Sequence, residues 1–173
     1  MEYDLSVENV FSDGGREFHT SSLMYRMEHG RIIHSEKRPD FFNKTKRVGD
    51  YPKAIYLAIK GEIHFFPDIM SVYRLGTSGS WTKSIENRKN LLEMQYSLIE
   101  MLKSVDDYTV YRFHETIIKI IEQRYLKILD KETSISVLTN REIRAVIKKQ
   151  NIKKRIKIYI KVLWLNKKRA RKK

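Results

Sequence analysis

The chain has 173 residues, of which 35 are Lys or Arg and 21 are Asp or Glu, so its formal net charge is +14. With 41% hydrophobic residues, three prolines and no cysteine, the composition predicts a folded core and excludes linkers, disulfide scaffolds and cysteine-based metal sites. No charge-free apolar run approaches the ~20 residues of a membrane span, and the first residues lack the pattern of a secretory signal. These features predict a cytoplasmic protein that is soluble or peripheral on the inner face of a membrane.

The excess positive charge lies at one end of the chain. Residues 1–142 carry 21 basic and 21 acidic side chains, whereas residues 143–173 carry 14 basic side chains and no acidic one. The body is therefore neutral, and the C-terminal tail is strongly basic.

In the first half of the chain, short segments are separated by turn signals. Residues 1–17 read as irregular, residues 29–45 as loop with one helical turn, and the charge-free residues 18–25 as a short buried strand. A helix over residues 53–60 is predicted with an acid as N-cap, a proline in its first turn and Gly61 after its end. Strands are expected over 62–66 and 69–75, followed by a loop over 76–81.

The second half has the periodicity of helices. Apolar residues predict one helix from about Leu91 to Ser104 and another over 110–129, joined around Asp106 and Asp107. The Thr139 and Glu142 pair has the capping-box spacing and predicts the start of a third helix. The apolar stretch 156–165 of the tail fits an amphipathic helix or an alternating strand equally well.

Five motifs follow one another between residues 18 and 82: His19–Arg26, Gly49–Pro52, Lys60–Phe65, Met70–Arg74 and Gly79–Thr82. In this order and spacing they resemble the acceptor-side half of the family 2 glycosyltransferases, bacterial enzymes that build capsule, lipopolysaccharide and other cell-surface glycans.

The resemblance implies a fold and a division of the chain. We expect a partial GT-A-like α/β region with few short strands over residues 1–85, a helical extension over 86–142 and a basic amphipathic tail over 143–173. The chain as a whole is expected to be mostly helical.

The resemblance also implies a reaction. These enzymes transfer a sugar from a nucleotide-diphosphate donor with inversion, so a carboxylate must take the proton from the attacking acceptor hydroxyl. The acid of the Gly49–Pro52 motif has that role in the family, which assigns it to Asp50. A second interpretation stays open, because Asp is among the best N-cap residues and Asp50 could simply cap the following helix.

The resemblance places further residues near donor and acceptor. Those expected near the donor diphosphate or in the loop that covers it are Tyr73, Arg74, Ser80 and Trp81, and an Arg suits phosphate because its guanidinium binds bidentately. Those expected on the acceptor side are His19, Ser21, Ser22 and Tyr51.

Each of these roles has a structural alternative. Arg74 could pair with a carboxylate at a strand end, and Trp81 could anchor its loop by packing. The hydroxyls of Ser21 and Ser22 could bond to backbone within a buried strand. The remaining histidines, His29, His34, His64 and His114, lack metal-ligand spacing and are expected at the surface or as hydrogen-bonded core residues.

The complete enzymes use a divalent cation, Mn²⁺ or Mg²⁺, held through an Asp-x-Asp motif in a preceding nucleotide-binding half. This sequence contains no Asp-x-Asp, and Gly76 stands where many members carry a metal-holding His. Without that half the leaving diphosphate is not neutralised. We therefore expect a fragment or one part of a split enzyme that binds no metal and is inactive alone.

The basic tail has several interpretations. Lysines beside an apolar stripe are typical of a segment that lies on anionic lipid, which would suit an enzyme with lipid-linked acceptors, but a solvated or disordered terminus is also open. A nucleic-acid-binding module is the alternative function, although the neutral body offers no basic groove. A purely structural module is the third interpretation.

Overall fold

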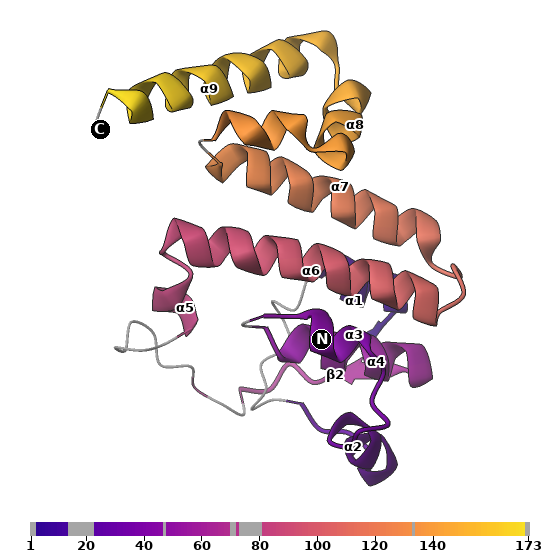
Figure 1. The fold of residues 1–173 in the computed structure, drawn as a ribbon. Helices are drawn as coiled ribbons and strands as arrows, with labels where there is room; N and C mark the ends of the chain where they lie inside the picture. Colours follow the sequence, from indigo (N-terminus) through magenta and orange to yellow (C-terminus); the bar gives the residue numbers. More distant parts are fainter. Residues whose placement is uncertain are drawn as a thin grey trace. The chain divides into compact units, whose positions relative to one another are not determined.

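The computed structural model describes residues 3–13, 23–46, 48–69, 72, 81–132 and 134–171 (Figure 1). The chain divides into two compact units, Met1–Ile120 and Ile121–Lys173, with the boundary inside helix α7. Each unit is described by itself.

Unit 1 opens with two elements in a segment that the sequence analysis took as irregular. Strand β1 (Tyr3–Leu5) is followed by helix α1 (Val7–Asp13), and β1 pairs antiparallel with β2 (Ile63–Phe65), with Asp4 opposite His64. The strand predicted over 62–66 is confirmed, whereas the prediction of an irregular N-terminus is wrong. A three-residue strand is too short to show a period in the sequence.

Helix α4 (Asp50–Lys60) is the predicted helix, with an earlier start. Gly49, not Asp50, is its N-cap, so the interpretation of Asp50 as the cap is wrong. Its apolar side, which includes Ala54 and Ile55, is fully buried, and it packs against α1, where Val10 and Phe11 are also fully buried. Gly61 ends the helix as predicted, and its N–H donates to the Leu57 carbonyl.

Two short helices interrupt the polar region 29–45, which had been expected as loop with one helical turn. These are α2 (Met27–Ile33) and α3 (Phe41–Lys44). Each contributes one buried apolar side chain, Ile33 and Phe41, which the surrounding charged residues conceal in the sequence. The Phe41 ring meets the Tyr108 ring edge-on, with centroids 5.4 Å apart.

Helix α6 (Arg88–Tyr108) is the longest helix of unit 1 and follows the short helix α5 (Trp81–Ser84). The Asn87 side chain caps α6 by accepting hydrogen bonds from the Lys89 and Asn90 N–H groups. The predicted end at Ser104 and junction at Asp106 and Asp107 are wrong, because α6 continues to Tyr108.

The turn between α6 and α7 (His114–Lys131) therefore spans residues 109–113. Val110 and Tyr111 occupy the left-handed region of backbone space, with φ of 51° and 60°. Across the turn, Asp106 Oδ2 lies 2.6 Å from His114 Nδ1, and Asp106 is buried. This pair holds the start of α7 against the end of α6. His114 is thus hydrogen-bonded, as the sequence analysis expected.

Unit 2 contains the C-terminal part of α7, the 3₁₀ helix η2 (Ile135–Thr139) and helices α8 (Arg141–Lys149) and α9 (Ile152–Ala170). Its buried side chains include Ile128, Ile143, Ile147 and Val162. The cap of α8 is Asn140, which accepts from the Glu142 and Ile143 N–H groups, so the predicted cap at Thr139 is wrong by one residue.

The basic tail is a helix that belongs to unit 2. Helix α9 contacts both α8 and η2, and Val162 is fully buried, so neither a strand nor a disordered terminus describes residues 152–170. One residue before Val162, the Lys161 ammonium donates to the carboxylate and, at 2.9 Å, to the carbonyl of Asp130 at the end of α7.

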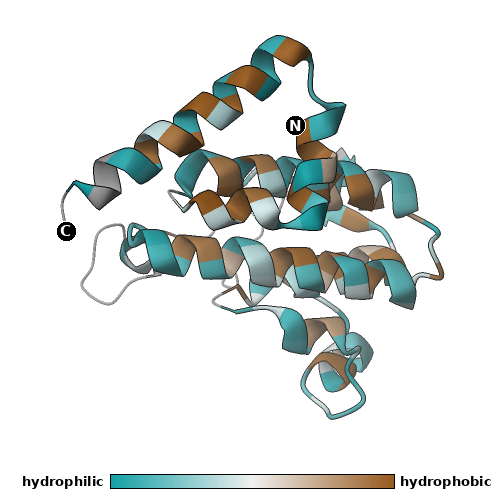
Figure 2. Ribbon diagram, turned by 45° about the horizontal axis from the view of Figure 1, so that its top comes forward, coloured by the Kyte–Doolittle hydropathy of each residue, from teal (hydrophilic) through white to brown (hydrophobic). Residues whose placement is uncertain are grey.

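The described part of the chain is mostly helical, as predicted, with β1 and β2 as its sheet. Of the other two predicted strands, the described residues 23–25, 69 and 72 are not strand, and the rest lie outside the described residues. Apolar and polar residues alternate along most helices (Figure 2). None of the described helices is long and apolar enough to cross a membrane.

Candidate functional site

Asp50 is the first residue of α4 and has a half-buried side chain. Gly49 on its N-terminal side and the buried Tyr51 and Pro52 on its C-terminal side place it where the loop from α3 enters the helix. The helix N-terminus carries a partial positive charge that stabilises a carboxylate in the first turn. Asp50 is therefore placed to hold a negative charge at a helix end while keeping part of its side chain open to solvent.

Tyr51 has a different environment. Its side chain is fully buried, and its hydroxyl donates a 2.8 Å hydrogen bond to the Phe11 carbonyl at the end of α1. The ring thus fixes α4 against α1. The acceptor contact predicted for Tyr51 receives no support from this placement, but the bond does hold the first turn of α4, and with it Asp50, in position.

Most of the other predicted site residues belong to segments outside the described part of the chain. His19, Ser21, Ser22, Tyr73, Arg74 and Ser80 lie outside the described residues, and Trp81 is described only in its backbone, as the first residue of α5. Their proximity to Asp50 stays a prediction.

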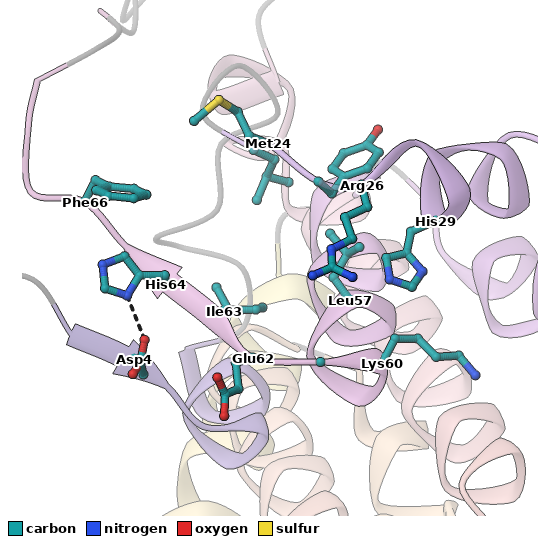
Figure 3. A pocket seen from close by; sticks show the side chains of 13 residues that line it. Asp4, Met24, Arg26, His29, Leu57, Lys60, Glu62, Ile63, His64 and Phe66 are labelled. Atoms are coloured by element: carbon teal, nitrogen blue, oxygen red, sulfur yellow. Dashed lines mark hydrogen bonds and ion pairs between the residues drawn. The ribbon is translucent and has the colours of Figure 1, made fainter.

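A pocket of about 590 Å³ opens in unit 1 between the start of α2, the end of α4 and β2 (Figure 3). Its lining includes Leu23–Arg26 and Lys60–His64, which are parts of two of the motifs from the sequence analysis. These segments are more than thirty residues apart in the chain, and the fold brings them to one cavity. The full lining is Asp4, Leu23, Met24, Tyr25, Arg26, His29, Leu57, Lys60, Gly61, Glu62, Ile63, His64 and Phe66.

The walls of this pocket combine apolar and charged groups. Figure 3 shows Arg26, His29 and Leu57 on one side, with His64 and Phe66 on the other. His64 Nδ1 lies 2.7 Å from the Asp4 carboxylate. This contact joins the two strands and gives the Asp4 carboxylate a partner. A cavity that combines apolar walls with a guanidinium is suited to a ligand that has both an apolar body and an anionic or hydroxyl group.

Lys60 at the rim is also oriented by aromatic rings. Its ammonium lies 5.7 Å from the ring centroids of both Tyr56 and Tyr108. Burial raises the pKa of the Tyr56 phenol, and the positive charge of Lys60 acts in the opposite direction. These contacts fix the last turn of α4 and hence one wall of the pocket.

Asp50 and the pocket lie at opposite ends of α4. Ten residues separate Asp50 from Lys60, and a helix rises about 1.5 Å per residue, so the two ends are about 15 Å apart. The pocket is therefore a second feature, separate from the immediate surroundings of Asp50.

Sequence analysis missed the Asp4, His29 and His64 side chains of the pocket. Asp4 lies on the unpredicted strand β1, and His29 on the unpredicted helix α2. The alternation in Glu62–Phe66 had predicted the strand that carries His64, but its partner strand depends on a pairing over sixty residues that no local pattern reveals. Among the described residues, no group of three His, Asp or Glu side chains is placed to hold a metal ion.

Comparisons with models of protein families, with curated proteins and with solved structures gave no match. The resemblance to the family 2 glycosyltransferases thus depends on the five ordered motifs and on where the fold places their described residues.

Proposed function

We propose that this chain supplies the acceptor-side half of an inverting family 2 glycosyltransferase, with Asp50 as the general base. The observation that carries the proposal is the position of Asp50: it belongs to the motif Gly49–Pro52, it is not the helix cap, and its side chain is half-buried at a helix end. The pocket adds support, because parts of two further motifs line it together.

In the proposed reaction, the Asp50 carboxylate accepts the proton of an acceptor hydroxyl as its oxygen forms a bond to the anomeric carbon of the donor sugar. The bond from that carbon to the nucleotide diphosphate breaks on the opposite face, and the diphosphate leaves with the bonding electron pair. The anomeric configuration is inverted. Base catalysis of this kind contributes about 10²- to 10⁴-fold to a rate.

The acceptor is proposed to be a cell-surface glycan or a lipid-linked sugar. Tyr51 positions Asp50 by anchoring the first turn of α4 to α1 through its buried hydrogen bond. Tyr73, Arg74, Ser80 and Trp81 are proposed to lie toward the donor, and His19, Ser21 and Ser22 toward the acceptor.

Charge neutralisation of the diphosphate is assigned to a divalent cation in a donor-binding half. The 173 residues contain no Asp-x-Asp motif that would hold such a cation. Mn²⁺ or Mg²⁺ would stabilise the negative charge that develops on the leaving group. We therefore propose that the chain alone does not transfer sugar.

The proposal is tested by supplying the missing half. The donor-binding half of a characterised family 2 glycosyltransferase, including its Asp-x-Asp motif, is joined upstream of Met1 and assayed with nucleotide sugars, Mn²⁺ and glycan acceptors. Transfer by the joined protein and none by the 173-residue chain is the expected result. Transfer or donor hydrolysis by the chain alone contradicts the assignment of donor binding to another half, and no transfer by the joined protein with any donor contradicts the acceptor-side role.

A further inference from the structure

Helix α9 has two apolar sides, and only one of them is packed. The packed side contains Val162, which is fully buried, with Ile158 and Leu165 half-buried beside it at helical spacing. Its contacts are with α8 and η2 of the same unit. This side accounts for the attachment of α9 to unit 2.

The second apolar side is exposed to solvent. At about 100° per residue, its members cover an arc of the helix surface that runs from about 60° to about 200° round from Val162. Ile152 is 71% exposed, Ile160 61% and Trp164 59%. We call this set the α9 stripe: Ile152, Ile156, Tyr159, Ile160, Leu163 and Trp164. Figure 2 shows that hydrophobic and hydrophilic residues alternate along this helix, which leads to the C-terminus.

Exposed cations lie within the stripe and along one edge of it. Lys153 and Lys167 are exposed within its arc, near the two ends of the helix, and Lys157 is exposed at its edge. Residues 143–173 contain no acidic side chain. Lys161, which lies farther round the helix, is held by Asp130 and so stays on the packed side. A solvated helix face normally carries polar residues, so this many exposed apolar side chains indicate a surface with a partner.

The charge around the stripe selects the partner. An apolar stripe with Trp and Tyr, with lysines within it and at its edge, is complementary to the interface of an anionic bilayer, where rings and aliphatic side chains enter the headgroup region and lysines reach the phosphates. A nucleic acid would use the lysines but would leave the isoleucines and leucine in water.

We propose that the α9 stripe docks the chain on an anionic membrane surface. Helix α9 lies in the plane of the interface with the stripe toward the acyl chains, while Val162 keeps it attached to unit 2. This inference rests on α9 alone and does not depend on the glycosyltransferase proposal.

The test is co-sedimentation of the full chain with vesicles of phosphatidylcholine, with and without phosphatidylglycerol. Binding is expected only with the anionic lipid and is expected to weaken at high salt, because the lysine contribution is screened. In a Trp81→Phe background, the fluorescence of Trp164 is expected to shift to the blue on binding. Failure to bind anionic vesicles at low salt overturns the proposal.

Two variants separate the apolar and electrostatic contributions. Ile156→Asn with Leu163→Asn keeps every charge and is expected to lower the partition coefficient at least about tenfold. Lys153→Gln with Lys157→Gln is expected to lower it by about 25-fold, since each lysine near an anionic surface contributes about fivefold.

Matched controls lie in unit 1. Ile69→Asn with Val72→Asn removes two apolar side chains that are more than 90% exposed, and Lys37→Gln with Lys89→Gln removes two exposed charges. Neither control is expected to change vesicle binding. Lipid docking is contradicted if the stripe and control variants lose vesicle binding equally. It is also contradicted if an oligonucleotide displaces the vesicles and binds the stripe variant as well as the unmodified chain. Self-association through the stripe without vesicle binding contradicts it as well.

Discussion

At the scale of single residues, Asp50 and Tyr51 have different roles within one motif. Asp50 keeps part of its side chain accessible at the start of α4, whereas Tyr51 is fully buried and bonded to the Phe11 carbonyl. Neighbouring residues on a helix point about 100° apart, so one can serve a site while the next holds the helix in place. The motif therefore combines a candidate base with its structural anchor.

The Tyr51 hydrogen bond yields a stability prediction. Tyr51→Phe keeps the ring but leaves the buried Phe11 carbonyl without this donor, and we expect the free energy of unfolding to fall by about 1–3 kcal/mol. Denaturant unfolding measures the change. Tyr108→Phe, at a partly exposed tyrosine of the same unit, serves as the control, and an equal loss in both variants would contradict the argument.

The Asp130 and Lys161 pair yields a pH prediction. The hydrogen bond from Lys161 holds the pKa of the Asp130 carboxyl below its ordinary value. A lowered carboxyl pKa stabilises the fold above the unfolded pKa of about 3.9, and this contribution is lost as the pH falls through the lower folded pKa.

Asp130→Asn is therefore expected to lower the free energy of unfolding by about 0.2–1 kcal/mol at neutral pH, since both side chains are partly exposed. The variant and the unmodified chain should converge in acid, once the pH has fallen through the lowered pKa of Asp130. Thermal unfolding across this range measures the difference, and a difference that is as large in acid as at neutral pH would argue against the pair.

At the scale of elements, the sequence predicted long amphipathic helices well and short elements poorly. The α6 and α7 regions were found because their apolar residues repeat over several turns, and the α4 and α8 regions because residues at their ends have the types typical of helix termini. Strand β1 and helices α2 and α3 were missed because three to seven residues contain too few repeats, and their pairing partners lie far along the chain. The pocket was missed with them, since three of its lining residues, Asp4, Arg26 and His29, belong to or adjoin these elements.

The helix junctions were missed for a different reason. The acidic pair Asp106 and Asp107 looks like a linker, but Asp106 is buried and bonded to His114, so the helix continues past it. The left-handed backbone at Val110 and Tyr111, which forms the actual turn, has no sequence signal, because neither residue type favours that conformation.

The cap of α8 gives a prediction that separates sequence pattern from structure. Asn140→Ala removes the acceptor for the Glu142 and Ile143 N–H groups and is expected to lower the free energy of unfolding by about 0.5–2 kcal/mol. Asn140→Asp should retain most of the stability. Thr139→Ala, at the position that the capping-box pattern had selected, is expected to have the smaller effect, and the reverse order would restore Thr139 as the cap.

At the scale of the whole molecule, the charge of +14 resolves into two parts with different roles. The neutral residues 1–142 contain Asp50 and the pocket, whereas the basic surplus lies in residues 143–173, which form most of α8 and all of α9. Because α9 is packed through Val162, this surplus is carried by a folded helix, and removing residues 151–173 would expose the core of unit 2. Point substitutions on the α9 stripe are therefore the sharper experiment.

The central claim is that Asp50 is the base of a sugar transfer completed by a donor-binding half. The most direct measurement compares the transfer rate of the joined protein with that of its Asp50→Asn variant, with Asp68→Asn, an exposed aspartate of the same unit, as the control. The account predicts that Asp50→Asn lowers the rate by about 10²- to 10⁴-fold while unfolding changes little, and that Asp68→Asn leaves the rate unchanged. An Asp50→Asn variant that transfers sugar as fast as the unmodified protein would contradict it.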